Sequence, residues 1–191
     1  MRTVPNPEPG LLLNPILARV GRRLVISNIG AGFMDGTVSI IDPETGTVDT
    51  VIRSREAGDG FGIALAADGT MIAVGAPQAS SGRGAVHLFD RRGRLRRTMV
   101  PGDPDATCFG KAVAVRGDAV LIGAPCTSLA DGEEGAAYLY STRTGALLGR
   151  YPGTDGGGRL GLNVALLRTA VVLAGRGPDT SDSGVVPIFP R

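Results

Sequence analysis

The 191-residue sequence predicts an all-β fold, a β-propeller of four-stranded antiparallel blades with about four blades in a single domain over residues 1–191. Three observations carry this prediction. Motifs recur at intervals of about 48 residues, as when Phe61-Gly62 returns as Phe109-Gly110. The first three repeats each hold four short apolar runs, and the first run of the second, third and fourth repeats is rich in Gly and Ala. Four-stranded repeats of roughly 40–50 residues are typical of propeller blades, and small residues suit the axis where blades converge.

Two repeats define the pattern. Phe61–Pro77 (FGIALAADGTMIAVGAP) returns as Phe109–Pro125 (FGKAVAVRGDAVLIGAP), and Gly84–Phe89 returns as Gly135–Tyr140. Weaker copies lie before and after, at 13–53 and 160–189, around the central repeats at 61–100 and 109–151. A β-sandwich of short strands is the alternative, and the fixed period argues against it.

Within the second repeat, turn signals separate the expected strands. Asp68-Gly69, Pro77–Gly84 and Arg91–Gly93 break up the apolar sequence. Runs of four to seven residues joined by such turns form antiparallel meanders. The expected strands are therefore 62–66, 71–74, 85–89 and 95–100.

The fourth repeat ends after its third strand, and Met1–Val4 has the phase of the missing outermost strand. We therefore expect the N-terminal strand to complete the last blade. Three arrangements remain open: a monomeric ring of four blades, a homodimer whose chains share an eight-bladed ring, and part of a longer propeller.

Composition narrows the class of partner. The formal net charge of +2 is too small to indicate nucleic-acid binding, and no apolar run is long enough to cross a membrane. The single histidine, His87, falls in a third strand where the other repeats vary, so we expect an outward or inter-blade position without a catalytic role. Met1–Leu13 lacks the apolar stretch of a signal peptide, so an exported protein would be a mature form.

The two strong repeats resemble FG-GAP repeats, the blades of the integrin α-subunit propeller and of many bacterial surface proteins. Phe61 and Phe109 would fill the gap between blades, and the following Gly would let the backbone bend into the inner strand. Pro77 and Pro125, which lack an N–H, would end the second strand. The resemblance implies a binding or adhesion module of a secreted, periplasmic or cell-surface protein.

Integrin-type repeats often carry a calcium loop between the first two strands, but the connection Ala66–Thr70 is too short to wrap a metal. No cofactor or metal is therefore expected, although acidic residues in the next loops could hold calcium weakly. These residues are Asp131, Glu133, Glu134, Asp179 and Asp182.

Cys108 and Cys126 flank the first hairpin of the third repeat. If residues facing each other across that hairpin have numbers summing to 234, as Val113 and Leu121 do, the cysteines lie directly opposite. Cross-strand separations suit a disulfide, which would imply an oxidising compartment.

No catalytic motif is present, so we expect a non-catalytic module that binds a protein or extracellular ligand through loops on one face. The candidate loops join second to third strands, with inter-blade loops on the opposite or adjoining rim. The candidate contact residues are Gln78, Ser81, Arg83, Asp131, Glu133, Glu134, Asp179 and Asp182.

Two other readings remain. Arg91, Arg92, Arg94, Arg96 and Arg97 could hold an anion, although charge on an outer edge strand also protects it against aggregation. A lectin-like propeller that binds glycans is the rival function, and a structural part of a larger propeller is the third. Sugar-binding sites favour an aromatic side chain on which the sugar can stack. The only tyrosines available for this role are Tyr138, Tyr140 and Tyr151.

Overall fold

The computed structural model describes residues 13–29, 36–128, 134–153, 158–176 and 184–191, which contain strands and turns but no helix. No helix among them could therefore span a bilayer. The strands form four four-stranded antiparallel sheets, the blades of a β-propeller. The first blade contains β1 (Leu13–Val20), β2 (Arg23–Ile29), β3 (Gly36–Ile41) and β4 (Val48–Arg53). The second contains β5 (Ala64–Ala67), β6 (Met71–Ala76), β7 (Ala85–Asp90) and β8 (Leu95–Met99). The third contains β9 (Ala112–Arg116), β10 (Ala119–Ala124), β11 (Ala136–Ser141) and β12 (Leu147–Pro152).

The fourth blade contains β13 (Asn163–Leu166), β14 (Ala170–Arg176), β15 (Gly184–Val185) and β16 (Ile188–Pro190). Both β15 and β16 pair with β14, so together they occupy the third position as one interrupted strand. Pro187 lies at the interruption and has no N–H to give to the ladder. The expected completion of this blade by Met1–Val4 falls outside the described residues.

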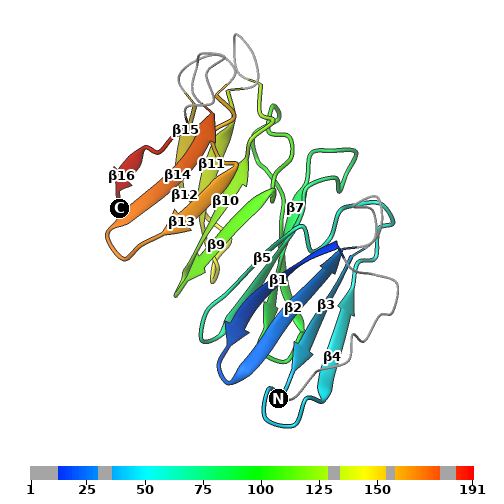
Figure 1. The fold of residues 1–191 in the computed structure, drawn as a ribbon. Helices are drawn as coiled ribbons and strands as arrows, with labels where there is room; N and C mark the ends of the chain where they lie inside the picture. The colour runs from blue at the N-terminus through cyan, green and yellow to red at the C-terminus, as the bar shows by residue number, and fades with distance from the viewer. Residues whose placement is uncertain (1–12, 30–35, 129–133, 154–157, 177–183) are drawn as a thin grey trace.

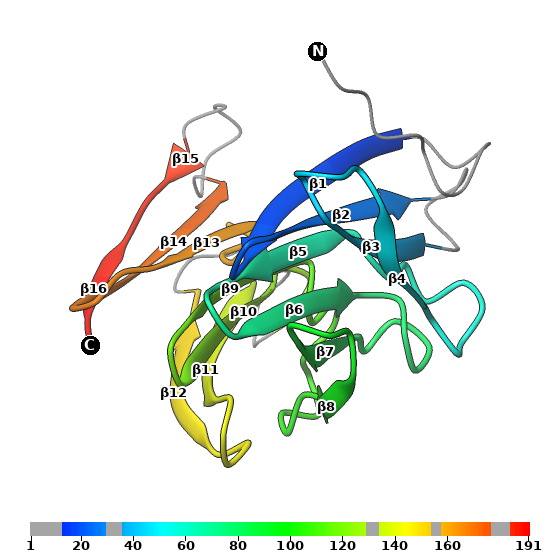
Figure 2. The same cartoon turned by 90° about the horizontal axis from the view of Figure 1, so that it is seen from below.

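Neighbouring blades meet through their inner strands. β1 contacts β5, β5 contacts β9, and β9 contacts β13, whereas no comparable contact joins β13 to β1 among the described residues. Figure 1 shows the blades in a row with the first and fourth at its ends, and Figure 2 shows the inner strands gathered while the outer strands point away.

The expected strand boundaries are close to those observed. β6 ends at Ala76 and β10 at Ala124, each immediately before the proline that was expected to stop it. The expected bend after phenylalanine also occurs, because Gly62 and Gly110 have φ angles of 90° and 93°, a region that glycine adopts most readily.

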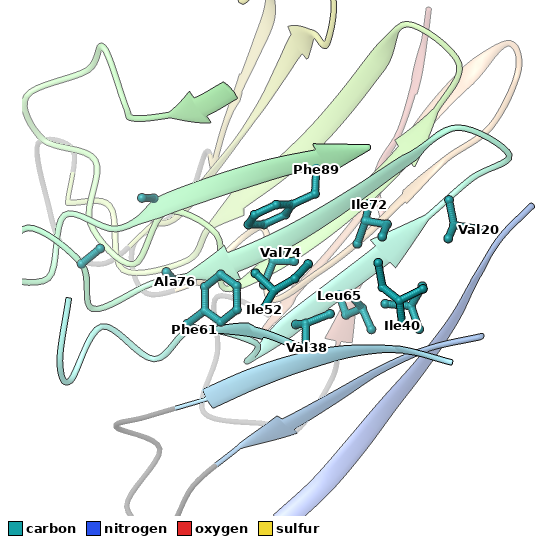
Figure 3. Close-up of a cluster of buried hydrophobic side chains, with 13 residues drawn as sticks. Val20, Val38, Ile40, Ile52, Phe61, Leu65, Ile72, Val74, Ala76 and Phe89 are labelled. Atoms are coloured by element: carbon teal, nitrogen blue, oxygen red, sulfur yellow. The ribbon is translucent and has the colours of Figure 1, made fainter. Parts of the chain in front are cut away.

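The core lies in the contacts between blades, which we call seams. In the first seam, Phe61 is 1% exposed and packs with Val38 and Ile52 of the first blade and Phe89 of the second (Figure 3). Phe109 has the same role in the second seam. The prediction that these phenylalanines fill the gap between blades is confirmed, and burial of such a ring stabilises by roughly 1.5–3 kcal/mol.

Candidate binding surface

The loops joining second to third strands lie at the same end of the blades as the inter-blade loops. The Gln78 N–H donates to the Asp59 carbonyl at 2.9 Å, and the Cys108 N–H donates to the Gly82 carbonyl at 2.9 Å. Two inter-blade loops therefore flank the loop of the second blade. We call this end of the molecule the loop end. The inter-blade loops, which we expected on the opposite or adjoining rim, also lie at this end.

Three of the predicted contact residues stand together at the loop end. Gln78, Ser81 and Arg83 are all exposed in the loop 77–84 of the second blade. The Arg83 guanidinium donates through Nη2 to the Asp103 carbonyl at 3.1 Å. The Ser80 N–H donates to Glu56 Oε1 at 2.9 Å on the other side. These contacts hold the exposed side chains of one loop between its two neighbours.

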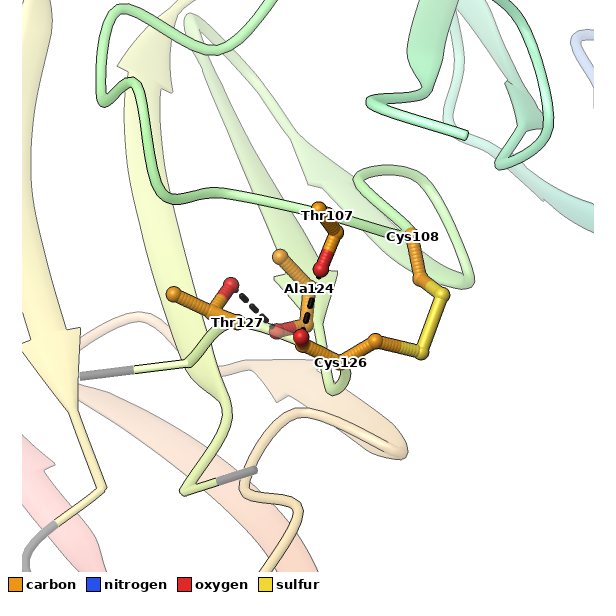
Figure 4. The surroundings of a disulfide bond; sticks show 5 residues. All are labelled: Thr107, Cys108, Ala124, Cys126 and Thr127. Carbon is orange, nitrogen blue, oxygen red and sulfur yellow. Dashed lines mark hydrogen bonds between the residues drawn. A yellow bond between two sulfur atoms is a disulfide. The ribbon is translucent and has the colours of Figure 1, made fainter. Parts of the chain in front are cut away.

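The predicted disulfide between Cys108 and Cys126 is present, with 5.5 Å between the two Cα atoms. It ties an inter-blade loop to the end of β10, and the Thr107 hydroxyl donates to the Cys126 carbonyl beside it (Figure 4). The Thr127 hydroxyl donates to the Ala124 carbonyl at 2.8 Å. The third blade's part of the loop end is thus pinned covalently and by hydrogen bonds.

The predicted hairpin register was nevertheless wrong by one residue. Val113 pairs with Ile122, and Leu121 pairs with Ala114, instead of Val113 with Leu121. The turn contains two residues, Gly117 and Asp118, whereas the sum of 234 assumed a loop of three residues. The cysteines are therefore not register partners. Cys108 lies outside the strand, where its φ is 56°, and is bonded to Cys126.

The predicted acidic residues are not gathered into a site among the described residues. Glu134 is only 8% exposed, so it is not presented to a ligand as we expected. Its backbone carbonyl accepts the Leu160 N–H at 2.9 Å, so the chain is bound to the fourth blade at this point. Asp131, Glu133, Asp179 and Asp182 lie outside the described residues. The described part of the chain has no cluster of three His, Cys, Asp or Glu side chains suited to a metal ion.

Asp103, Tyr138 and Arg150 form a charged hydrogen-bonded group, which we call the charged tie, in the outer part of the second seam. The Tyr138 hydroxyl donates to Asp103 Oδ2 at 2.9 Å, and Arg150 Nη2 lies 2.8 Å from the same oxygen. Burial, together with the hydrogen bond to Asp103, raises the pKa of Tyr138 to about 12. For Asp103, burial alone would raise the pKa, but the bonds from Tyr138 and Arg150 lower it overall.

The tyrosines pack in seams. The rings of Tyr138 and Tyr140 lie 5.8 and 6.0 Å from the ring of Phe109, and Tyr151 lies 5.0 Å from Phe189. Tyr138 is 1% exposed and Tyr140 is 6% exposed. Neither ring offers a face on which a sugar could stack.

His87 lies in the first seam, as predicted, with its ring 5.7 Å from Phe61 and 6.4 Å from Phe89. Its Nδ1 is 3.1 Å from the Thr98 hydroxyl oxygen. Desolvation lowers the pKa of His87, although Asp59 and Glu56 oppose the shift. Sequence reasoning placed His87 but did not identify the pocket of about 520 Å³ that it lines.

The predicted arginine run lies at the turn between β7 and β8, opposite the loop end, and its members diverge. Arg96 lies 3.6 Å from Asp90, and the guanidinium of Arg97 donates to the Arg143 carbonyl. Arg91 and Arg92 line a separate hollow, whose cationic residues also include Arg22 and Arg23. Arg94 is exposed and is not part of that hollow. The structure therefore does not bring the five arginines into one anion site.

Comparison with known proteins supports this architecture. The FG-GAP repeat family matches residues 55–89 and 99–140, the second and third blades. No curated protein matches the chain significantly.

Solved structures show the fold. The Dos1 propeller matches with a TM-score of 0.58 and 12% identity over 91% of this chain and 42% of its own. Saccharomyces cerevisiae Sqt1 matches with a TM-score of 0.56 and 14% identity over 87% and 41%. A europium-containing methanol dehydrogenase matches with a TM-score of 0.51 and 17% identity over 72% and 24%. The chain spans less than half of each of these structures. The second and third blades therefore match the FG-GAP repeat family, and the chain as a whole has a β-propeller fold.

Proposed function

We propose that this chain is a non-catalytic binding module that recognises a protein partner through the loop end of its blades. The observation that carries the proposal is the connection between exposed loops. Arg83 reaches the Asp103 backbone, Ser80 is held by Glu56, and Cys108 is bonded to Cys126. Loops fixed in this way present side chains at little further cost in conformational entropy when a partner binds.

The proposed partner is a protein rather than a glycan. Gln78, Ser81 and Arg83 offer exposed hydrogen-bonding groups at the loop end. The buried rings of Tyr138 and Tyr140, by contrast, give no support to a sugar platform. The lectin reading therefore has no described feature in its favour.

A photo-crosslinking residue at position 81 tests this proposal. The same residue at position 143 is the matched control, because Arg143 is also exposed but lies in the turn between β11 and β12 at the opposite end. The expected result is a discrete protein adduct from position 81 that excess unlabelled chain removes and that position 143 does not give. No adduct, or the same adducts from both positions, would overturn the proposal.

We also propose that the protein works in a secreted, periplasmic or cell-surface setting, because disulfides persist in oxidising compartments. The Cys108–Cys126 bond supports this location. Fractionation of the producing cells with the thiols blocked at lysis tests it. Protein found in the cytosol with both cysteines free would contradict it.

The assembly is proposed to be a ring that either one chain or two copies complete. Leu139 in the third seam is 4% exposed, whereas Ile188, which occupies the corresponding strand of the last blade, is 67% exposed. This surface resembles a seam without its next blade. Light scattering distinguishes a particle of 19.5 kDa, the mass of one chain, from one of twice that mass. A polydisperse sample would favour a part of a larger propeller.

A further inference from the structure

The first seam contains an open pocket of about 520 Å³ near the loop end, between β4 and the outer strands β7 and β8. Ligand pockets in proteins commonly occupy about 300–1,000 Å³. Its lining reaches inward to Phe61 and Phe89, two side chains of the buried core. The corresponding hollow at the second seam, of about 670 Å³, reaches the buried rings of Tyr138 and Tyr140 but does not reach Phe109.

The repeat explains this difference. Tyr138 pairs with Arg150 across β11 and β12, and His87 pairs with Thr98 at the same place across β7 and β8. Asp103, which binds both Tyr138 and Arg150, has Arg55 as its counterpart 48 residues earlier.

Because histidine and threonine are shorter than tyrosine and arginine, the first seam is not crossed in the same way. Among the described residues, His87 Nδ1 has one hydrogen-bond partner, the Thr98 hydroxyl, and Arg55 forms no hydrogen bond or ion pair with either residue. The charged tie that lines the hollow of the second seam is therefore missing from the first, where the pocket extends inward to Phe61.

The chemistry of the pocket is apolar inside and cationic at its edge. Phe61 and Phe89 form the floor, and Leu95 and Val100, which are 47% and 58% exposed, extend the apolar surface along β8. Arg55 is exposed at the mouth.

The acidic residues of the lining accept hydrogen bonds from neutral groups of the same lining. Asp59 accepts the Phe61 N–H at 2.8 Å and the Ser54 hydroxyl, and Glu56 accepts the Ser80 N–H at 2.9 Å. Asp59 is only 2% exposed, and the exposed charged residues of the lining are Arg53, Arg55 and Glu56. Positive charge is therefore in excess at the mouth and complements a carboxylate.

We propose that this pocket binds an extended peptide segment of a protein partner, with a bulky apolar side chain against Phe61 and Phe89 and an acidic neighbour facing Arg55. The elongated apolar surface of β8 suits an extended chain better than a compact small molecule. The inference rests on the proposed protein-binding function and adds a second contact place to it.

Fluorescein-labelled pentapeptides test the ligand chemistry with the full chain. The probes are Gly-Asp-X-Asp-Gly with Phe, Leu or Trp at X, and the controls are Gly-Asp-Ala-Asp-Gly and Gly-Lys-Phe-Lys-Gly. We expect saturable anisotropy with at least one probe and at least tenfold weaker binding of both controls. Failure of all three probes to bind at about 1 mM, or equal binding of the controls, would overturn the proposal.

A transplanted seam tests the place. The triple variant R55D/H87Y/T98R copies the tie of the second seam into the first, so the fold already accommodates the same arrangement one blade along. We expect it to lose probe binding at least tenfold while keeping its circular dichroism spectrum. The matched control Arg143→Ser changes an exposed arginine at the opposite end and should bind as the unmodified chain does.

The Arg55→Ser variant distinguishes the contribution of the Arg55 charge to binding from that of the pocket's shape. It should weaken binding of Gly-Asp-Phe-Asp-Gly but leave Gly-Ser-Phe-Ser-Gly unchanged. Unaltered probe binding by the folded triple variant would overturn the pocket assignment. An adduct from position 81 without peptide binding would overturn this inference alone, whereas absence of that adduct would count against the proposed function itself.

Discussion

Gly123 of the third blade lies directly against the backbone of Gly161 in the fourth. A Cβ atom on Gly123 would stand 2.1 Å from the Gly161 carbonyl oxygen. The same relationship joins Gly75 to Gly110 one seam earlier, where the distance would be 1.9 Å. The glycine of the Gly-Ala-Pro motif is thus required by the next blade, because no side chain fits between the two backbones.

Replacement of Gly123 with alanine should therefore destabilise the chain by about 1–3 kcal/mol, the usual cost of overpacking. Gly69→Ala is the matched control, because a Cβ atom there meets nothing within 4 Å. Urea denaturation followed by circular dichroism measures both variants. Equal midpoints for G123A and G69A would show that the seam can move apart freely.

Reduction of the Cys108–Cys126 bond should lower the free energy of unfolding by roughly 3 kcal/mol in the chain-entropy account of disulfides. Thermal denaturation with and without a phosphine reductant checks this. The double variant C108S/C126S should match the reduced protein and ignore the reductant. A reductant effect on the double variant would point to a cause other than this bond.

Asp68 should make the protein sensitive to acid. Burial alone would raise its pKa, but N–H groups of Thr70, Met71 and, in the next blade, Gly117 lower it overall. A lowered pKa stabilises the fold above the unfolded-state value of about 3.9, and this contribution disappears as pH falls through the folded-state value. Asp68→Asn should therefore be less stable than the unmodified chain at pH 7, by a difference that narrows towards pH 2. A constant difference would contradict the linkage.

Tyr138 should make the protein sensitive to alkali. Its pKa is raised to about 12, above the ordinary value of about 10. A raised pKa stabilises the fold fully below the unfolded-state value, and the contribution is lost as pH rises from about 10 to 12. Stability measured across this range should fall more steeply for the unmodified chain than for Tyr138→Phe. Phenolate absorbance that reports all three tyrosines titrating near pH 10 in the folded protein would refute the shift.

The blades were predictable from the sequence because they depend on local patterns. The Phe61-Gly62 motif, the strand-ending Pro77 and the turn at Asp68-Gly69 each act within a few residues. The disulfide between Cys108 and Cys126 was also predicted correctly. The assumed hairpin register was wrong, because the loop length of a hairpin cannot be read reliably from a turn containing Gly117.

Contacts between blades were harder to predict because they depend on packing across many residues. Nothing near Glu134 in the sequence indicates that its carbonyl accepts the Leu160 N–H or that its side chain is buried. The bond from Gly117 to Asp68 likewise joins two hairpins that are 49 residues apart. The pocket beside His87 becomes visible only when its seam is compared with the seam beside Tyr138.

Because the described seams join only consecutive blades, they also affect which blades unfold locally first. In such arrays each unit is stabilised by itself and by its immediate neighbours. The second and third blades have two described seams each, whereas the first and fourth have one. Amide hydrogens of β6 and β10 should consequently exchange with solvent more slowly than those of β14, so the two central blades form the slowest-opening part of the molecule.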